Sequence, residues 1–190
     1  MDTKPFEFFL NVNYLLIKPT YLQGVPNLDE SFEVKILPVK EGVKFLDRKT
    51  NQERLLLLKD EIVNISILDQ STIGDRVGFK RLLLVGIFAL AWKKRTAIPL
   101  SFLVIDYRDR FGAIQEMFIQ SEAKEGFQFF TNVKYNLQRC WDDIFTHPNA
   151  DSIISTVERN KAKDTQEERK TFAIGCLFII IIAVTLVLFL

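Results

Sequence analysis

The chain has 190 residues, of which 48% are hydrophobic and 26% are charged, and its formal net charge is +1. This composition predicts a folded domain with one apolar tail, because about 150 positions remain for a single globular unit once the C-terminal run and its approach are set aside. A net charge so near zero gives no reason to expect nucleic-acid binding, since nucleic-acid binders usually carry a strong basic excess.

The N-terminal residues do not have the pattern of a secretory signal. Asp2 and Glu7 flank the first apolar residues, and no small-residue cleavage site follows them. We therefore expect residues 1–30 to be an N-terminal extension, and the domain that follows, residues 31–141, to stay in the cytosol.

Residues 32–68 are predicted to form four short strands. In FEVKILPV the apolar side chains of Phe32, Val34 and Ile36 alternate with charged ones, and a turn at residues 40–42 precedes a second alternating run in VKFLD. The apolar run RLLLL and the strand-like run IVNISIL follow, with a short link between them. These patterns indicate antiparallel hairpins.

The stretch RLLLVGIFALAWKKR begins like a membrane span but is too short for one. Its 11 apolar residues, Leu82–Trp92, end at the basic cluster Lys93, Lys94 and Arg95, whereas a spanning helix needs about 20. We expect this run to belong to the buried core. Leucine and alanine favour a short helix, which the single glycine opposes, so a strand stays the alternative.

Two further strands and a helix complete the predicted domain. SFLVIDY and EMFIQ bracket a loop in which Gly112 can take the positive φ of a tight turn. From Glu122 to Trp141, apolar residues recur at three- and four-residue steps, which predicts an amphipathic helix with the stripe Ala123, Phe127, Phe130, Val133, Leu137 and Trp141. We expect this helix to pack over an open sheet edge or a barrel end; docking into the groove of a partner is the alternative.

The chain resembles a known superfamily in its order of elements and in two stretches of sequence. The order is hairpin strands followed by one amphipathic helix. RLLLVGIFALAWKKR followed by SFLVIDYRD, and the segment YLQGVPNL, are similar to phrases of bacterial pleckstrin-homology-like (PH-like) and GRAM-like domains, and the resemblance covers roughly residues 20–141. It implies an α+β fold, with a small PH-like antiparallel β-barrel or sandwich and a C-terminal amphipathic helix. Pro99 departs from the expected strand pattern and suggests an edge position or a later strand start. Because this superfamily is defined by its fold, the resemblance implies a binding scaffold without specifying a ligand.

The C-terminal run FAIGCLFIIIIAVTLVLFL is long enough to cross a bilayer. Its 19 residues, from Phe172 to Leu190, carry no charge, and basic residues precede it, so the N-terminal domain is expected on the cytoplasmic side. We expect a single transmembrane helix over residues 171–190, joined to the domain by a juxtamembrane linker helix over residues 142–170. These features predict a tail-anchored, single-pass protein of the plasma membrane.

The sequence contains no recognisable catalytic or metal-binding pattern. The single histidine, His147, has no cysteine or second histidine at metal-ligand spacing, and Cys140 and Cys176 lie 36 residues apart. No glycine-rich phosphate loop occurs either. We therefore expect a protein that is not an enzyme and that needs no cofactor.

Two binding functions remain, with a membrane-perturbing effector as a less favoured third. The first is an adaptor that binds a protein partner at the membrane through an exposed strand edge or through the Phe129 and Tyr135 side of the helix. The second is a domain that reads an anionic lipid surface. Its expected contact residues are Lys93, Lys94, Arg95, Arg48 and Lys49.

Overall fold

The computed structural model describes residues 2–12, 14–26, 28, 30–69, 72 and 100–166. The chain divides into two compact units, Met1–Thr146 and His147–Leu190, which are described separately. Two segments singled out by the sequence, residues 81–95 with their basic cluster and the apolar run at 172–190, lie outside the described residues.

The first unit is built on an antiparallel sheet that has seven strands among the described residues. The strand order is β4-β3-β2-β1-β7-β6-β5. The strands are β1 (Thr20–Gln23), β2 (Phe32–Pro38), β3 (Gly42–Asp47), β4 (Glu53–Leu58), β5 (Ile62–Asp69), β6 (Ser101–Arg108) and β7 (Ile114–Ser121).

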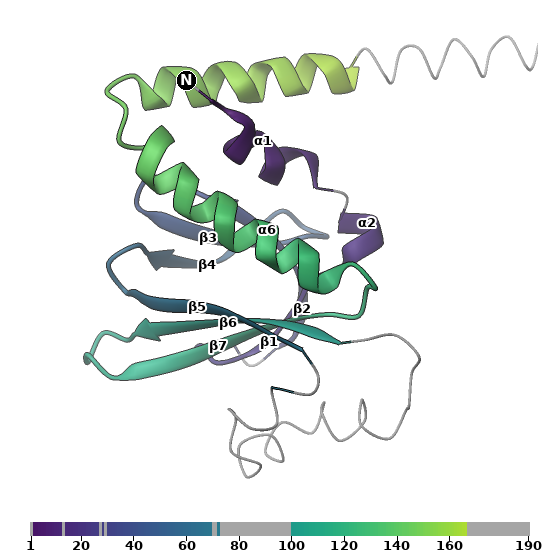
Figure 1. Cartoon of the computed structure of the whole chain (residues 1–190), viewed down its shortest axis with the longest axis vertical. Coiled ribbons are helices and arrows are strands. Elements are labelled where there is room, and N and C mark those ends of the chain that lie inside the picture. The colour runs from purple at the N-terminus through teal and green to yellow at the C-terminus, as the bar shows by residue number, and fades with distance from the viewer. Residues whose placement is uncertain are drawn as a thin grey trace, which may run out of the picture. The chain divides into compact units, whose positions relative to one another are not determined.

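The two edge strands of the sheet are neighbours in the chain, so the sheet must curve until one end of each edge strand lies close to the other. β4 ends at Leu58 and β5 begins at Ile62, although the two strands stand at opposite ends of the strand order. The short link is held from both sides: the backbone N–H of Lys59 donates to the Glu41 carbonyl at 2.7 Å, and that of Arg108 donates to the Glu61 carbonyl at 2.8 Å. The link therefore joins the two edges of the sheet at one end (Figure 1).

Helices from both ends of the first unit pack together against this sheet. α1 (Lys4–Asn11) and α2 (Tyr14–Ile17) precede β1, while α6 (Gly126–Arg139) follows β7 and continues into a π-helical turn, η1 (Cys140–Ile144). α6 contacts β5 and β6, and α1 contacts α6, η1 and β2. A seven-stranded antiparallel sheet followed by a C-terminal helix is a PH-like architecture, and the fold class is α+β. The largest fully buried side chains are Tyr21, Phe9, Phe45, Phe102, Phe130, Ile36, Leu103, Ile105, Met117, Ile119 and Leu137.

Strand β6 is buried on both of its faces. Successive side chains of a strand point to opposite sides, yet Phe102, Leu103, Val104 and Ile105 are all at most 1% exposed. One face lies toward α6, which contacts β6, and the other belongs to an apolar cluster made of Leu22, Leu68, Leu100, Phe102, Val104 and Phe118. A strand buried in this way reads as a nearly continuous apolar run, which is how SFLVIDY reads.

The six strands expected from the sequence are confirmed, but the sheet also contains β1, which the sequence did not predict. Thr20–Gln23 lies within the segment expected to be an N-terminal extension, and it pairs with both β2 and β7. Short helices occupy residues 4–17 of the same segment. The first 30 residues therefore supply a central strand and two helices of the first unit.

The amphipathic helix is confirmed, but its limits and its buried face differ from the prediction. It begins at Gly126, and Phe127, which we placed in the apolar stripe, is 48% exposed. Phe129, which we placed on the free side, is 4% exposed, because the ring of Phe8 on α1 lies 6.3 Å from its own. The buried face of the helix is wider than the predicted stripe because α1 covers part of it.

In the second unit, residues 150–166 form a helix, within the segment expected to be a juxtamembrane linker. Ala150 begins it, with its backbone N–H donating to the His147 carbonyl at 3.0 Å. No helix within the described ranges is long and apolar enough to cross a membrane, and the expected span at Phe172–Leu190 lies outside them.

Candidate functional site

A pocket of about 280 Å³ opens between the N-terminal helices and the first half of α6. Its apolar lining is Phe8, Val12, Ile17 and Phe129, and its polar lining is Asn11, Glu125, Gln128 and Asn132. Three of the four polar residues, Asn11, Gln128 and Asn132, have amide side chains, which both donate and accept hydrogen bonds. An apolar floor with an amide rim suits an apolar side chain whose neighbouring backbone is polar.

The α1 side of the pocket is fixed by buried side chains of that helix and by contacts at its beginning. Pro5 suits the first turn of α1, where a backbone N–H has no helical partner, and Phe6 and Phe9 are buried in the core. Asp2, just before the helix, accepts a hydrogen bond from the Lys4 N–H at 3.1 Å and another from the Arg139 guanidinium at 3.2 Å. The Lys4 N–H and, to a lesser degree, Arg139 lower the pKa of the Asp2 carboxyl. These bonds tie the beginning of α1 to the end of α6.

The floor of the pocket is held by bonds between α2, β7 and the start of α6. The hydroxyl of Ser121 donates to the Ile17 carbonyl at 2.9 Å, and the same oxygen accepts from the Ala123 N–H at 3.3 Å. Gly126 packs against this serine so closely that an added Cβ would lie 2.9 Å from the Ser121 oxygen. These contacts join the α2 side of the pocket to the start of α6.

Two exposed apolar side chains are chain neighbours of lining residues. Leu16, which is 75% exposed, precedes Ile17, and Phe127, which is 48% exposed, precedes Gln128. Because successive residues of a helix point about 100° apart, Phe127 lies on the face of α6 opposite the lining residues Glu125, Gln128, Phe129 and Asn132.

The residues expected to contact lipid fall into two groups. Lys93, Lys94 and Arg95 lie outside the described residues. Arg48 and Lys49 lie in the β3–β4 turn, where Arg48 forms an ion pair with Glu33 and Lys49 is exposed. The ion pair partly neutralises the positive charge of this turn.

The remaining predicted contacts differ in their exposure. Tyr135 is 57% exposed on α6, whereas Phe129 belongs to the pocket and is covered. β4 and β5 form the two edges of the sheet, and the link between them brings one end of each edge together. The Phe129 and Tyr135 side of the helix is thus not one continuous contact surface.

The chemically reactive residues do not come together. His147 is exposed, and its Nδ1 atom accepts a hydrogen bond from the Asn149 N–H at 3.2 Å. Cys140 is fully buried beside Trp141, and burial raises the pKa of its thiol to about 12. Among the described residues, no group of three or more His, Cys, Asp or Glu side chains is placed to hold a metal ion.

Comparisons with known proteins give no relative for this chain. It matches no protein-family model, no curated protein and no solved structure. The likeness to PH-like domains therefore rests on the strand order and the C-terminal helix, and a shared fold does not by itself specify a ligand.

Proposed function

We propose that the protein is a non-catalytic adaptor, held at the cytoplasmic face of the plasma membrane by its C-terminal apolar run, that binds a protein partner through the pocket between α1 and α6. The observation that carries the proposal is this pocket, whose lining combines apolar side chains with three amides. A resemblance to PH-like domains also supports a binding role, since these domains serve as scaffolds for recognition.

The pocket suits a protein side chain better than a charged ligand. Among the described residues that line the pocket, only Glu125 is charged, so an anionic headgroup would meet a carboxylate and no cation there. An apolar anchor residue of a partner would fill the floor, while the amides of Gln128, Asn132 and Asn11 pair with the backbone around it. Buried anchors of this kind usually carry most of the energy of an interface.

The membrane attachment supplies affinity that a small pocket lacks. An interface of this size is expected to be weak alone, because binding also costs translational and side-chain freedom. Confinement of both partners to one surface raises their effective concentration and strengthens such a contact without new bonds. The 19-residue apolar run at Phe172–Leu190 is the segment that we expect to provide this confinement.

Photo-crosslinking from two glutamines of α6 tests the pocket. A photoreactive residue replaces either Gln128, which lines the pocket, or Gln138, which is exposed on the same helix and does not line it. In the full chain in its host cells, position 128 is expected to give a discrete protein adduct, and position 138 is not. Equal adducts from both positions, or none from position 128, would contradict the proposal.

A second substitution separates binding from folding. Val12→Ser on the background of the position 128 probe should reduce the adduct about tenfold, because the substitution removes an apolar side chain from the pocket lining. Phe127→Ser, which removes an exposed aromatic side chain on the opposite face of α6, should leave the adduct unchanged.

A further inference from the structure

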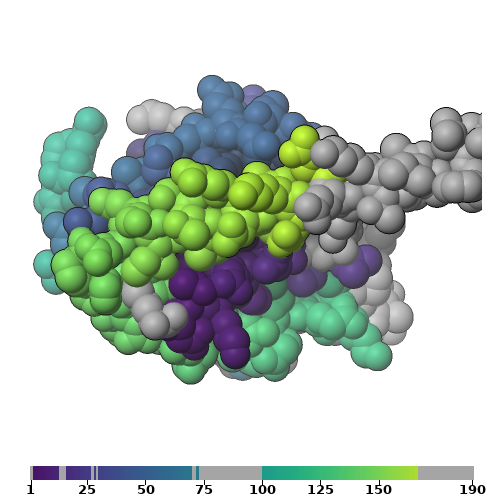
Figure 2. Space-filling model, turned by 90° about the horizontal axis from the view of Figure 1, so that it is seen from above, coloured from purple at the N-terminus to yellow at the C-terminus, as the bar shows by residue number. Residues whose placement is uncertain are grey.

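The tip of the β6–β7 hairpin, residues 108–114, is the most exposed apolar feature in the described part of the first unit. Phe111 is 79% exposed and Ile114 is 62% exposed. In Figure 2 this hairpin, drawn in teal at the left, projects beyond the surrounding surface. Apolar side chains on a projecting turn can reach another surface without any movement of the sheet.

The conformation of the hairpin tip is fixed by Asp109. One oxygen of its carboxylate accepts from the Phe111 N–H at 2.9 Å and the Ala113 N–H at 3.0 Å, and the other accepts from the Gln115 amide at 3.1 Å. Gly112 supplies the positive φ of 80° that the turn needs. Because the tip is preformed, little conformational entropy is lost when it contacts a ligand.

The hairpin tip also carries two exposed cations. The guanidinium of Arg110 lies 4.7 Å from the centre of the Phe111 ring, and Arg108 is exposed at the base of the tip. The carboxylate of Asp109 is turned toward the backbone of its own loop. In the adjacent β4–β5 link, the Glu61 carboxylate accepts from the Leu58 N–H at 2.9 Å. The far end of the tip therefore presents one cation and two apolar side chains.

We propose that the hairpin tip contacts an anionic bilayer surface, with Phe111 and Ile114 in the interfacial layer and Arg108 and Arg110 against anionic headgroups. An exposed aromatic ring paired with arginine suits this layer, since the ring enters the apolar boundary while the cation stays among headgroups. The inference rests on the membrane attachment in the proposed function.

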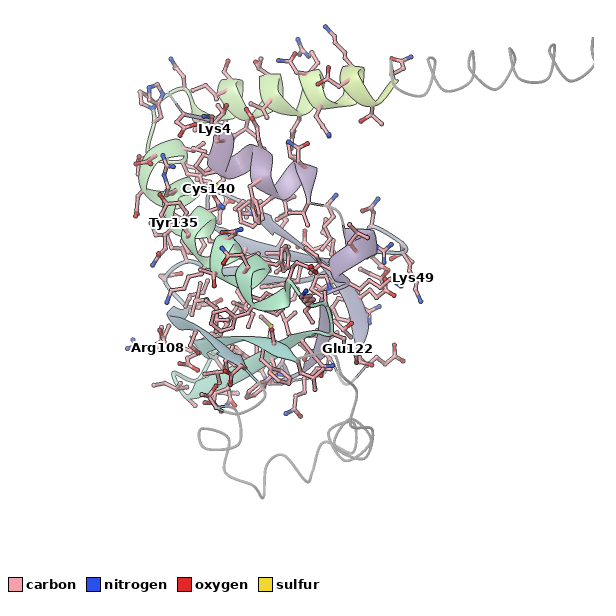
Figure 3. All side chains as sticks on the ribbon, turned by 45° about the vertical axis from the view of Figure 1, so that its right-hand side comes forward. Lys4, Lys49, Arg108, Glu122, Tyr135 and Cys140 are labelled. Atoms are coloured by element: carbon pink, nitrogen blue, oxygen red, sulfur yellow. The ribbon has the colours of Figure 1, made fainter. Side chains whose placement is uncertain are left out.

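This contact surface differs from the one expected from the sequence. Figure 3 shows Arg108 and Lys49 on opposite sides of the domain in that view, so the hairpin tip and the β3–β4 turn are separate surfaces. The hairpin tip also lies outside the pocket lining, which leaves the pocket available to a partner.

Tryptophan fluorescence of the full chain tests the proposal. Phe111→Trp places a reporter at the tip, and the unmodified chain supplies the background from Trp92 and Trp141. The protein is incorporated into liposomes of phosphatidylcholine alone or with phosphatidylserine, with bromine atoms on the lipid chains. We expect a blue-shifted, bromine-quenched signal above background that is stronger with phosphatidylserine and weaker at high salt.

Charge variants identify the residues responsible. In the Phe111→Trp chain, Arg108→Gln and Arg110→Gln should each weaken the phosphatidylserine-dependent quenching about fivefold, whereas Lys49→Gln should not change it. A chain that floats with the liposomes while its reporter stays unquenched would overturn the hairpin contact and leave the attachment intact. A chain that does not float would overturn both, and equal quenching in both lipids would overturn the role of the arginines.

Discussion

The indole N–H of Trp141 donates a hydrogen bond to the carbonyl of Val39, 3.2 Å away, although the two residues are 102 positions apart in the chain. The same N–H lies 3.3 Å from the Gly42 carbonyl, and the Lys59 ammonium lies 5.7 Å from the centre of the ring. Trp141 therefore fastens η1 to the β2–β3 turn. Because η1 continues α6, this contact also helps to fix the helix that forms one wall of the pocket.

Trp141→Phe should lower the free energy of unfolding by about 1 to 2 kcal/mol, since the substitution removes one hydrogen bond and some packing. The cost stays moderate because Val39 and Gly42 also bond each other, with N–H to carbonyl distances of 2.9 and 3.2 Å. Chemical denaturation of the full chain measures the change. Tyr135→Phe on the exposed side of the helix is the control and should cost almost nothing.

Substitutions on the two faces of β6 should be similarly costly. Leu103→Ala opens a cavity on the face of β6 toward α6 and should cost about 2 to 5 kcal/mol, and Phe102→Ala in the apolar cluster on the other face should cost about 3 to 5 kcal/mol. Val63→Ala, at a 46% exposed position on β5, should cost far less. If Phe102→Ala were as mild as Val63→Ala, the outer face of β6 would be accessible to water in solution.

The thiol of Cys140 should be unreactive in the folded chain. Burial raises its pKa from 9.0 to about 12, which lowers the thiolate fraction near neutral pH about 1,000-fold before access is considered. The thiol has a lower pKa in the unfolded chain than in the folded one. The free energy of unfolding should therefore also fall as the pH rises above 9.0. Thiol titration of a Cys176→Ser chain, with and without denaturant, checks the reactivity; rapid labelling of the folded protein would contradict this picture.

The β6–β7 turn should loosen in acid. Hydrogen bonding by the Gln115 amide, and by the N–H groups of Phe111 and Ala113, lowers the pKa of the Asp109 carboxyl below 3.8. The ionised carboxylate thus stabilises the turn above pH 3.8, and that stabilisation is lost as the pH falls through the lower pKa of the folded state. Amide protection at residues 111 and 113, compared with that of β6, measures the effect. Asp109→Ala should reduce the same protection at neutral pH.

The local patterns of the sequence were sufficient for six strands and one helix. β2 pairs with β3 and β6 pairs with β7, so each hairpin joins strands that are close in the chain. The alternation in FEVKILPV and the glycine of the β6–β7 loop are local patterns that predict such hairpins. β1 was missed because it is only four residues long, too short for a clear alternation, and its partners are distant: Tyr21 pairs with Ile119.

The pocket could not be predicted, because it needs the position of α1. The helix pattern alone placed Phe127 inside and Phe129 outside, and the exposures are the reverse, 48% and 4%. The Phe8 ring, which lies 6.3 Å from the Phe129 ring, decides which aromatic is covered. A short apolar segment near the N-terminus, preceded by a proline at its first turn, is the signal that indicates such a helix.

In the proposed function, the pocket between α1 and α6 binds a protein partner, and membrane confinement strengthens this binding. The most direct measurement is the yield of the position 128 photo-adduct in host cells, in the full chain and in a chain with Ile180→Arg and Ile181→Arg in the apolar run. Two central charges oppose membrane insertion by about 5 to 7 kcal/mol together. We predict a strong adduct with the unaltered run and a sharply reduced one with the charged run, at equal protein levels. An adduct of unchanged yield in the charged chain would contradict the claim.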